Sequence, residues 1–324
     1  MNTAVRCGRD NALPRQNGMK YNENEEFMMK SVTLSLLQSA ANAFDFGGPV
    51  LCDAHHYGEG HINDTFVVWR EDHSKRFILQ RINTDTFTNP VGLMENVCGV
   101  TRHLRAKILA EGGDPARETL NVIPTLSGST CYLDADGGAW RAYDFVEDTI
   151  CLQQVGSETD FRTVAETLGK FQNQLEDYPA STLHETIARF HDTPNRYANF
   201  EKALAADALG RAKNITSEIE FIHAREQDCH VLLDQLAAGE IPLRVTHNDT
   251  KINNVLIDAA TGKGICVIDL DTVMPGLRPT TSAIPSAPVP TTALRTNLTS
   301  AKSILTCICT KCSPKGISPL PGHP

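Results

Sequence analysis

The sequence predicts an α+β fold with two lobes, a small strand-rich lobe followed by a helical lobe. Over 65–146, short apolar and β-branched runs alternate with polar turns, which is typical of strands. From about residue 158 the apolar residues recur at helical spacing instead. A chain of 324 residues is also long enough to bury a substantial core.

The first lobe is expected over 28–147. Helical spacing predicts a helix over 29–44, and a second helix is expected over 90–111, from Asn89-Pro90 to Gly112-Gly113. The segment 1–27 shows no period, and we expect it to be disordered or an over-extended start. The predicted strands are Thr65–Trp69, Arg76–Ile82, Val122–Leu126, Thr130–Leu133 and Trp140–Val146.

The second lobe is expected over 148–277. Its apolar spacing predicts helices over 160–176, 196–213 and 215–238, followed by a hairpin over 245–271. The turn of that hairpin is Thr261–Gly264, where threonine and two glycines interrupt the apolar runs.

Composition excludes several classes of protein. A hydrophobic content of 41% and a charged content of 21% are typical of a folded soluble chain. The net charge of -9 argues against a general nucleic-acid binder. No apolar run reaches membrane-spanning length and no signal-peptide pattern begins the chain, so we expect a cytoplasmic protein with no nucleic-acid, membrane or protein partner. The ten scattered cysteines are expected to be thiols.

The hairpin begins with the strongest chemical signal in the chain. His247, Asp249, Lys251 and Asn254 have the spacing of a kinase catalytic loop, His-x-Asp-x-Lys-x-x-Asn. Phosphoryl transfer needs a carboxylate to take the proton of the acceptor hydroxyl, and Asp249 suits that role. Lys251 is placed to reach the transferring phosphate. These residues predict ATP as the phosphate donor.

Carboxylates further along the hairpin complete a predicted magnesium site. Asp269 follows the second strand, and Asp271 comes two residues later. Mg²⁺ prefers hard oxygen ligands and keeps phosphate and water in its other positions, so one amide and one carboxylate suffice. We therefore expect Asn254 and Asp269 to hold Mg²⁺, with Asp271 as a further candidate ligand.

Candidate nucleotide contacts lie in the first lobe. Gly58 and Gly60 precede a strand, where backbone amides can approach phosphate oxygens, although such a glycine pair is also common in ordinary turns. His61, Asn63 and Thr65 supply polar groups there that can reach nucleotide or sugar.

A cation and a hinge are also expected in this lobe. Arg81 is the candidate cation for the α- and β-phosphates, with Gln80 as the nearest alternative at a position usually held by lysine. Glu95 is the candidate partner of that cation. Alternatively, Arg81 is an ordinary solvent-exposed charge on an edge strand, and Glu95 is an ordinary solvent-exposed charge on a helix. Asp144–Val146, which includes the candidates Asp144 and Val146, is the expected hinge whose backbone binds adenine.

A polar cluster lies between two predicted helices. Phe190–Thr193 and Arg196 have side chains that can contact substrate, but Asp192 and Thr193 before Pro194 also form a good helix start. We favour capping for Asp192 and Thr193, and Arg196 is retained as a candidate substrate contact.

Taken together, these motifs resemble the aminoglycoside phosphotransferase/choline kinase superfamily, and within it the N-acetylhexosamine 1-kinase-like branch. The resemblance implies a two-lobed protein-kinase-like fold and ATP- and Mg²⁺-dependent phosphorylation of the anomeric hydroxyl of an amino sugar, N-acetylglucosamine or N-acetylgalactosamine. It also implies that Asp249 is the catalytic aspartate and that His61 lies near the sugar. The segments that carry the resemblance are Gly58–Thr65, Ile78–Asn83, Gly92–Asn96, Phe190–Asp192, His247–Asn254 and Val267–Gly276.

The last residues, 278–324, depart from the rest of the chain. They contain no acidic or aromatic residue and hold nearly half of the 17 prolines. This composition predicts a disordered low-complexity tail. The codons possible for Thr280–Ile284 also allow Tyr-Asp-Phe-Gly-Asp in the neighbouring frame, so we expect a shifted reading frame and an incomplete helical lobe. Three cysteines at 307–312 with no fourth ligand nearby make a poor zinc site.

Two alternatives to an amino-sugar kinase remain open. The acceptor could be another alcohol, such as choline, homoserine or an aminoglycoside. The chain could also be an inactive nucleotide-binding remnant, which would bind ATP without releasing ADP in response to an acceptor.

Overall fold

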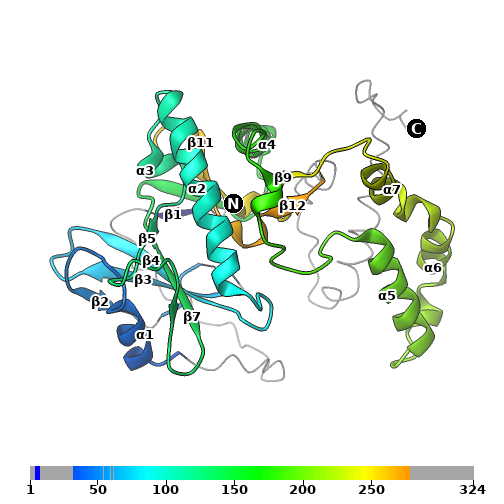
Figure 1. Cartoon of the computed structure of the whole chain (residues 1–324), viewed down its shortest axis with the longest axis horizontal. Helices are drawn as coiled ribbons and strands as arrows, with labels where there is room; N and C mark the ends of the chain where they lie inside the picture. The colour runs from blue at the N-terminus through cyan, green and yellow to red at the C-terminus, as the bar shows by residue number, and fades with distance from the viewer. Residues whose placement is uncertain (1–3, 8–31, 54, 59, 61, 278–324) are drawn as a thin grey trace. The chain divides into compact units, whose positions relative to one another are not determined.

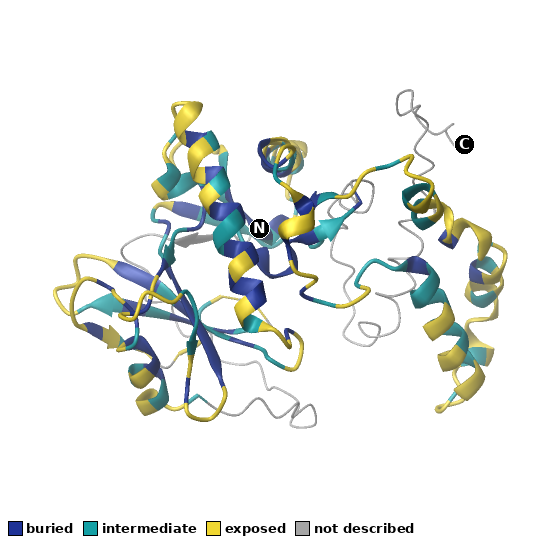
Figure 2. Ribbon diagram, viewed as in Figure 1, coloured by how far each residue is buried: buried dark blue, intermediate teal, exposed yellow. Residues whose placement is uncertain are grey.

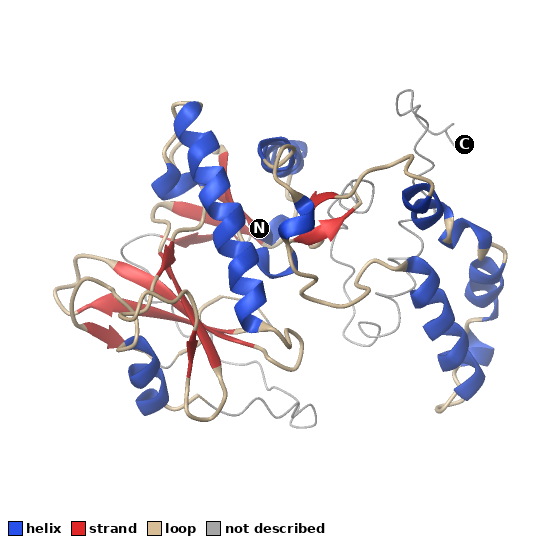
Figure 3. Cartoon of the chain, viewed as in Figure 1, coloured by secondary structure: helices blue, strands red, loops and turns tan. Residues whose placement is uncertain are grey.

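A computed structural model describes residues 4–7, 32–53, 55–58, 60 and 62–277 (Figure 1). The described residues divide into two compact units. The first, here called the sheet unit, contains those of 4–177 together with Ile252–Asp271. The second, the helical unit, contains 178–251 and 272–277. The combination of sheets and helices confirms the predicted α+β class (Figure 3).

The division between the units differs from the boundary expected near residue 147. Residues 148–177 and Ile252–Asp271 belong to the sheet unit because their strands pair with each other. Within the segment 1–27, Ala4–Cys7 form strand β1, and the remaining residues lie outside the described part of the chain. His61 and the tail 278–324 lie outside it as well.

A six-stranded sheet forms most of the sheet unit. Its strands run in the order β2-β3-β4-β7-β5, with β6 also paired to β7, and every pairing is antiparallel. The strand bounds are β2 Val50–Cys52, β3 Asp64–Arg70, β4 Arg76–Ile82, β5 Val122–Ile123, β6 Tyr132–Leu133 and β7 Ala139–Asp144.

The two faces of this sheet have different characters. Phe66, Leu79 and Ala142 are register neighbours, so they share one face, and they are buried in the core that includes Leu37 of the first helix. The opposite face carries polar side chains near the ends of β3 and β4. This opposite face is also largely covered, because Ile82, Arg141 and Tyr143 on it are buried.

Four helices belong to the sheet unit: α1 Leu34–Ala41, α2 Pro90–Ala110, α3 Pro115–Glu118 and α4 Glu158–Gln174. The predicted helix 90–111 is confirmed as α2. Asn89 caps it by accepting a hydrogen bond from the Gly92 N–H at 3.0 Å, and Pro90 fits the first turn because it lacks an N–H. Ser157 caps α4 in the same way.

A second, four-stranded sheet in the same unit joins distant parts of the chain. Its order is β1-β8-β10-β11, all antiparallel. Cys151 on β8 lies opposite Leu256 on β10, and its Sγ donates to the Asn253 carbonyl at 3.1 Å. Six cysteines are free thiols: Cys52, Cys98, Cys131, Cys151, Cys229 and Cys266. The strands are β1 Ala4–Cys7, β8 Thr149–Leu152, β10 Val255–Asp258 and β11 Gly264–Val267.

The helical unit has three α-helices and one pair of strands among its described residues. The predicted helix 215–238 is interrupted by a 3-10 turn that places Cys229 in a buried position. Much of the surface of these helices is exposed (Figure 2). The elements are α5 Thr193–Ala206, α6 Thr216–His223, α7 Val231–Ala237, β9 Arg244–Thr246 and β12 Met274–Gly276. The 3-10 turns of the described chain are Ala180–Thr182, Ala212–Asn214, Gln227–Cys229, Ile252–Asn254 and Leu270–Thr272.

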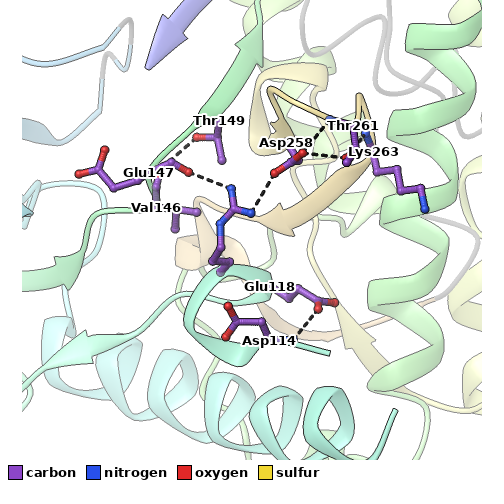
Figure 4. Close-up of polar contacts among 9 residues, drawn as sticks. Asp114, Glu118, Val146, Glu147, Thr149, Asp258, Thr261 and Lys263 are labelled. Atoms are coloured by element: carbon purple, nitrogen blue, oxygen red, sulfur yellow. Dashed lines mark hydrogen bonds and ion pairs between the residues drawn. The ribbon is translucent and has the colours of Figure 1, made fainter. Parts of the chain in front are cut away.

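Within the sheet unit, Arg117 of α3 joins Glu147, the residue after the expected hinge, to the hairpin β10–β11 (Figure 4). Its Nη1 donates to Asp258 Oδ2 at 2.9 Å and its Nη2 to the Glu147 carbonyl at 3.0 Å. Asp258 Oδ1 also accepts from the Thr261 N–H and Oγ1, both at 2.8 Å. Hydrogen bonds from Thr261 and Arg117 lower the pKa of Asp258 to about 2.

This lowered pKa predicts a pH-dependent contribution to stability. The pKa of Asp258 in the folded state lies below its unfolded value of about 3.9, so the contribution is present above that value and is lost as the pH falls through about 2. Asp258→Asn should lower the urea midpoint at pH 5, and the difference from the wild type should shrink between pH 4 and pH 2. A difference that stays constant across that range would contradict the assignment.

Candidate active site

Three residues of the predicted catalytic loop, His247, Asp249 and Lys251, lie in the helical unit, where β9 leads into the loop and β12 pairs with β9. Thr246 is paired with Met274 in the strand register, and its Oγ1 donates to the Met274 carbonyl at 3.1 Å. Gly276 permits this close pairing because a Cβ at that position would collide with the Thr246 side chain. The start of the loop is thereby fixed by backbone and side-chain bonds together.

Asn248 adopts a left-handed backbone conformation with φ 63°. Few residues other than glycine adopt this region without cost, so the surroundings must hold it. The Asn248 Nδ2 donates to the Thr272 carbonyl at 2.9 Å, and the Thr272 Oγ1 donates to the His247 carbonyl at 2.6 Å. Thr272 therefore binds both residues that precede Asp249.

His247 and Lys251 both contact Asp249. The His247 side chain is 1% exposed, and its Nδ1 accepts a hydrogen bond from the Asp249 N–H at 3.3 Å. The Lys251 Nζ lies 2.7 Å from Asp249 Oδ2, with the lysine side chain 58% exposed and the aspartate 22% exposed. The buried histidine orients the aspartate backbone, whereas the exposed lysine can reach toward a ligand.

His191 also touches this loop and was absent from the predicted site residues. Its Nε2 lies 3.2 Å from the Asn248 carbonyl, within hydrogen-bond distance. Burial lowers the pKa of His191, although the nearby Asn248 carbonyl and Asp249 carboxylate oppose that shift. The sequence signal was the polar cluster Phe190–Thr193, but nothing in it marked the histidine.

The predicted metal ligands Asn254 and Asp269 lie in the sheet unit. The Asn254 carbonyl accepts from the Ile268 N–H at 2.9 Å, so β10 and β11 bring the two candidates to neighbouring positions on one hairpin. Asn254 is 5% exposed, and Asp269 has a left-handed φ of 57°. A carboxylate and an amide oxygen on a rigid hairpin are hard donors that fit Mg²⁺.

Asp271 has a different environment from Asp269. It is 3% exposed, and both of its carboxylate oxygens accept hydrogen bonds within the sheet unit. Oδ1 accepts from Arg141 Nη1 of β7, and Oδ2 accepts from Asn63 Nδ2 at 2.7 Å. Both carboxylate oxygens of Asp271 are thus already hydrogen-bonded to side chains of the sheet unit, and its role as a metal ligand stays a prediction.

Gly58 and Gly60 lie in the glycine-rich segment that precedes β3. Gly58 has φ 83°, a conformation that glycine tolerates, and a Cβ at either Gly58 or Gly60 would meet no atom within 4 Å. The Tyr57 N–H donates to the Thr65 carbonyl at 2.7 Å. The Thr65 hydroxyl accepts from Gln80 Nε2 at 2.9 Å.

The strand register shows that Arg81 and Gln80, the two candidate phosphate contacts on β4, face opposite sides of the sheet. Arg81 shares a face with Asp64 and Trp140, and its guanidinium carbon lies 5.9 Å from the Trp140 ring centroid. Gln80, the alternative, faces the other side of the sheet with Arg141. Arg81 is therefore on the opposite face from Asp271, whose carboxylate pairs with Arg141.

The remaining predicted residues have the following places. Glu95 lies on the exposed side of α2. The Asp144 carboxylate pairs with Lys75 at 2.6 Å, and its N–H donates to the Asn121 carbonyl. The Val146 carbonyl accepts from the Thr149 hydroxyl at 3.1 Å.

Arg196 is engaged within its own segment of the helical unit. Its Nε donates to the Phe190 carbonyl at 2.9 Å, and its guanidinium carbon lies 5.5 Å from the Phe190 ring centroid. Asp192 caps α5 by accepting from the Asn195 N–H at 2.8 Å, so the favoured capping role of Asp192 agrees with the structure. The role of Arg196 as a substrate contact stays a prediction.

Residues 53–278 match the model of the phosphotransferase enzyme family. The match covers more than half of the chain, and the chain belongs to that family.

Three solved structures resemble the chain. An aminoglycoside phosphotransferase from Alicyclobacillus acidocaldarius is 13% identical, with 76% of this chain and 69% of that chain covered and a TM-score of 0.48. A spectinomycin phosphotransferase in complex with ADP and spectinomycin is 15% identical over 76% and 72%, with a TM-score of 0.45. A microcompartment-associated aminopropanol kinase is 17% identical over 87% and 82%, with a TM-score of 0.48.

Family membership makes this chain a small-molecule phosphotransferase. Within the described ranges, no helix is long and apolar enough to cross a membrane. The same residues contain no cluster of three or more His, Cys, Asp or Glu side chains suited to a metal ion. A two-ligand magnesium site built on an asparagine and one carboxylate is compatible with that finding.

The buried hydroxyl of Thr272 provides a test of loop support. Thr272→Val keeps the shape of the side chain but leaves the buried His247 carbonyl without this donor, at a cost of about 1–3 kcal/mol in the free energy of unfolding. Thr182→Val is the matched control, because the Thr182 hydroxyl also donates to a carbonyl but is exposed to water. Chemical denaturation of both variants measures the difference, and equal losses would contradict the proposed support.

Proposed function

We propose that this protein transfers the γ-phosphoryl group of ATP to the anomeric hydroxyl of an N-acetylhexosamine, N-acetylglucosamine or N-acetylgalactosamine. The observation that carries the proposal is the fixed catalytic loop, in which Asp249 is held by His247 and contacted by Lys251. The family match supports the reaction type, and the sequence motifs support the choice of sugar.

In this mechanism Asp249 accepts the proton of the sugar hydroxyl as the oxygen attacks phosphorus. His247 keeps the Asp249 backbone in place through its Nδ1. The Lys251 ammonium, now paired with Asp249, is exposed enough to approach the transferring phosphoryl group and offset its negative charge. Most of the rate enhancement is therefore expected from positioning and electrostatics.

Asn254 and Asp269 would hold Mg²⁺. The ion would neutralise oxygens of the β- and γ-phosphates. The backbone of the glycine-rich segment from Gly58 to Thr65 would cover the phosphates, and the segment Asp144–Val146 would bind the adenine ring. Thr65 would remain close to the phosphates because Gln80 fixes its hydroxyl.

Replacing the proposed base gives the first test of this function. Asp249→Asn should lower kcat by roughly 10²–10⁴-fold, because the amide cannot accept the hydroxyl proton, while the affinity for ADP changes little. Asp234→Asn, on the exposed side of α7, is the control. Acceptor-dependent ADP release measures the effect, and wild-type turnover in Asp249→Asn would remove Asp249 from the mechanism.

A panel of acceptors tests the choice of sugar. With ATP and Mg²⁺, the N-acetylhexosamines should give the highest kcat/KM, compared with choline, homoserine and an aminoglycoside. The product should be a phosphate on the anomeric carbon, which phosphorus NMR identifies by its coupling to the anomeric proton. A higher kcat/KM for an amine alcohol would replace the sugar assignment, and ADP binding without turnover on any acceptor would identify a nucleotide-binding remnant.

We also propose that the unusual composition of 278–324 arises from a shifted reading frame. These residues lie outside the described part of the chain, and the proposal is supported by the codons possible for Thr280–Ile284. Resequencing the coding DNA across codons 272–284 tests it. An inserted or missing base is expected, and an unchanged reading would rule out a sequencing error.

A further inference from the structure

A buried polar network occupies the face of the six-stranded sheet that carries Gln80 and Arg141. The Arg141 side chain is 2% exposed and that of Asp271 is 4% exposed. Arg141 Nη1 donates to Asp271 Oδ1, and Arg141 Nε donates to Gln80 Oε1 at 3.0 Å. Removing one partner of such a buried ion pair leaves an uncompensated charge, so both groups are needed together.

Arg141 stays protonated and positively charged in this environment. Burial alone would lower the pKa of the guanidinium, but the Asp271 carboxylate raises it, with smaller effects from Tyr143 and Asp269, and the net pKa is raised. The arginine is therefore a fixed positive charge beside Asp271, and Asp271 lies two residues after Asp269 in the chain.

Asn63 connects this pair to the segment that begins β3. Its Nδ2 donates to Asp271 Oδ2 at 2.7 Å, and its Oδ1 accepts from the Asn83 N–H at 3.0 Å. The amide nitrogen of Asn63 thus binds the turn after Asp269, and its amide oxygen binds the backbone just after β4. Asp271 has an oxygen bonded to Arg141 and another bonded to Asn63.

We propose that Asn63, Arg141 and Asp271 form a latch that positions the turn carrying Asp269, so that the latch raises the affinity for a Mg²⁺-bound nucleoside diphosphate. Asp271 is then a positioning residue rather than a metal ligand. The left-handed conformation of Asp269 costs free energy and needs such support from its neighbours. This inference rests on the proposed function, because it assumes that Asp269 binds the metal.

The latch predicts a specific loss in the Asn63→Ala variant. The affinity for ADP should fall about tenfold in the presence of Mg²⁺ and change little in its absence, because only the metal-bound nucleotide uses Asp269. Asn42→Ala is the matched control, since Asn42 makes a comparable side-chain hydrogen bond, to Gln38, on the exposed side of α1. Titration calorimetry with ADP, with and without Mg²⁺, measures all four affinities for the two variants.

A double-mutant cycle shows whether Asn63 acts through Asp271. In an Asp271→Asn background, Asn63→Ala should cause no further loss of Mg²⁺-dependent ADP affinity, since the hydrogen bond between the two is already altered. A purely structural role for Asn63 would lower the thermal midpoint while leaving the effect of Mg²⁺ on ADP affinity unchanged. That result, or an Asn63→Ala variant that matches Asn42→Ala in all affinities, overturns the latch.

The same experiment separates the latch from the proposed function. If the wild type binds ADP in a Mg²⁺-dependent manner and the variants behave as expected, but no acceptor is phosphorylated, the proposed activity fails and the latch stands. If an acceptor is phosphorylated, but Mg²⁺ changes the affinity for ADP equally in the wild type and in Asn63→Ala, the proposed activity stands and the latch fails. Wild-type protein that binds no ADP would overturn both.

Discussion

The pairing of β10 with β8 is the constraint on which the metal-binding part of the structure depends. It places the hairpin β10–β11, from late in the chain, in one sheet with a strand that follows the expected hinge. Arg117 strengthens this arrangement by binding the Glu147 carbonyl and Asp258 simultaneously. Residues separated by more than a hundred positions in the sequence are thereby held in one unit with Asn254 and Asp269.

The sequence was informative where chemistry requires a fixed spacing. The interval from His247 to Asn254 predicted a catalytic loop, and the structure shows a loop whose backbone is held by Thr246 and Thr272. The α+β class and helix α2 followed from periodicity and capping residues. Asn248, by contrast, carried no signal of its left-handed backbone, because the tertiary contacts that impose it come from residues elsewhere in the chain.

The faces of the sheet were harder to predict. Alternation along β4 shows that Gln80 and Arg81 point to opposite sides, but the sequence alone does not say which side is polar. Arg141 was missed for a related reason, since a charged residue within a predicted strand is usually assigned to an exposed edge. One signal was available: Arg141 is the single charged residue in the otherwise apolar run Trp140–Tyr143, and a buried charge needs a partner.

The reactivity of the Cys151 thiol can be used to follow the docking of the hairpin β10–β11 on β8. It lies on β8 opposite Leu256 and donates to the Asn253 carbonyl, the residue just before the candidate metal ligand Asn254. Its accessibility to an alkylating reagent therefore depends on whether the hairpin is docked on β8. A native cysteine at this position reports on the integrity of the metal-binding hairpin without any cysteine being introduced.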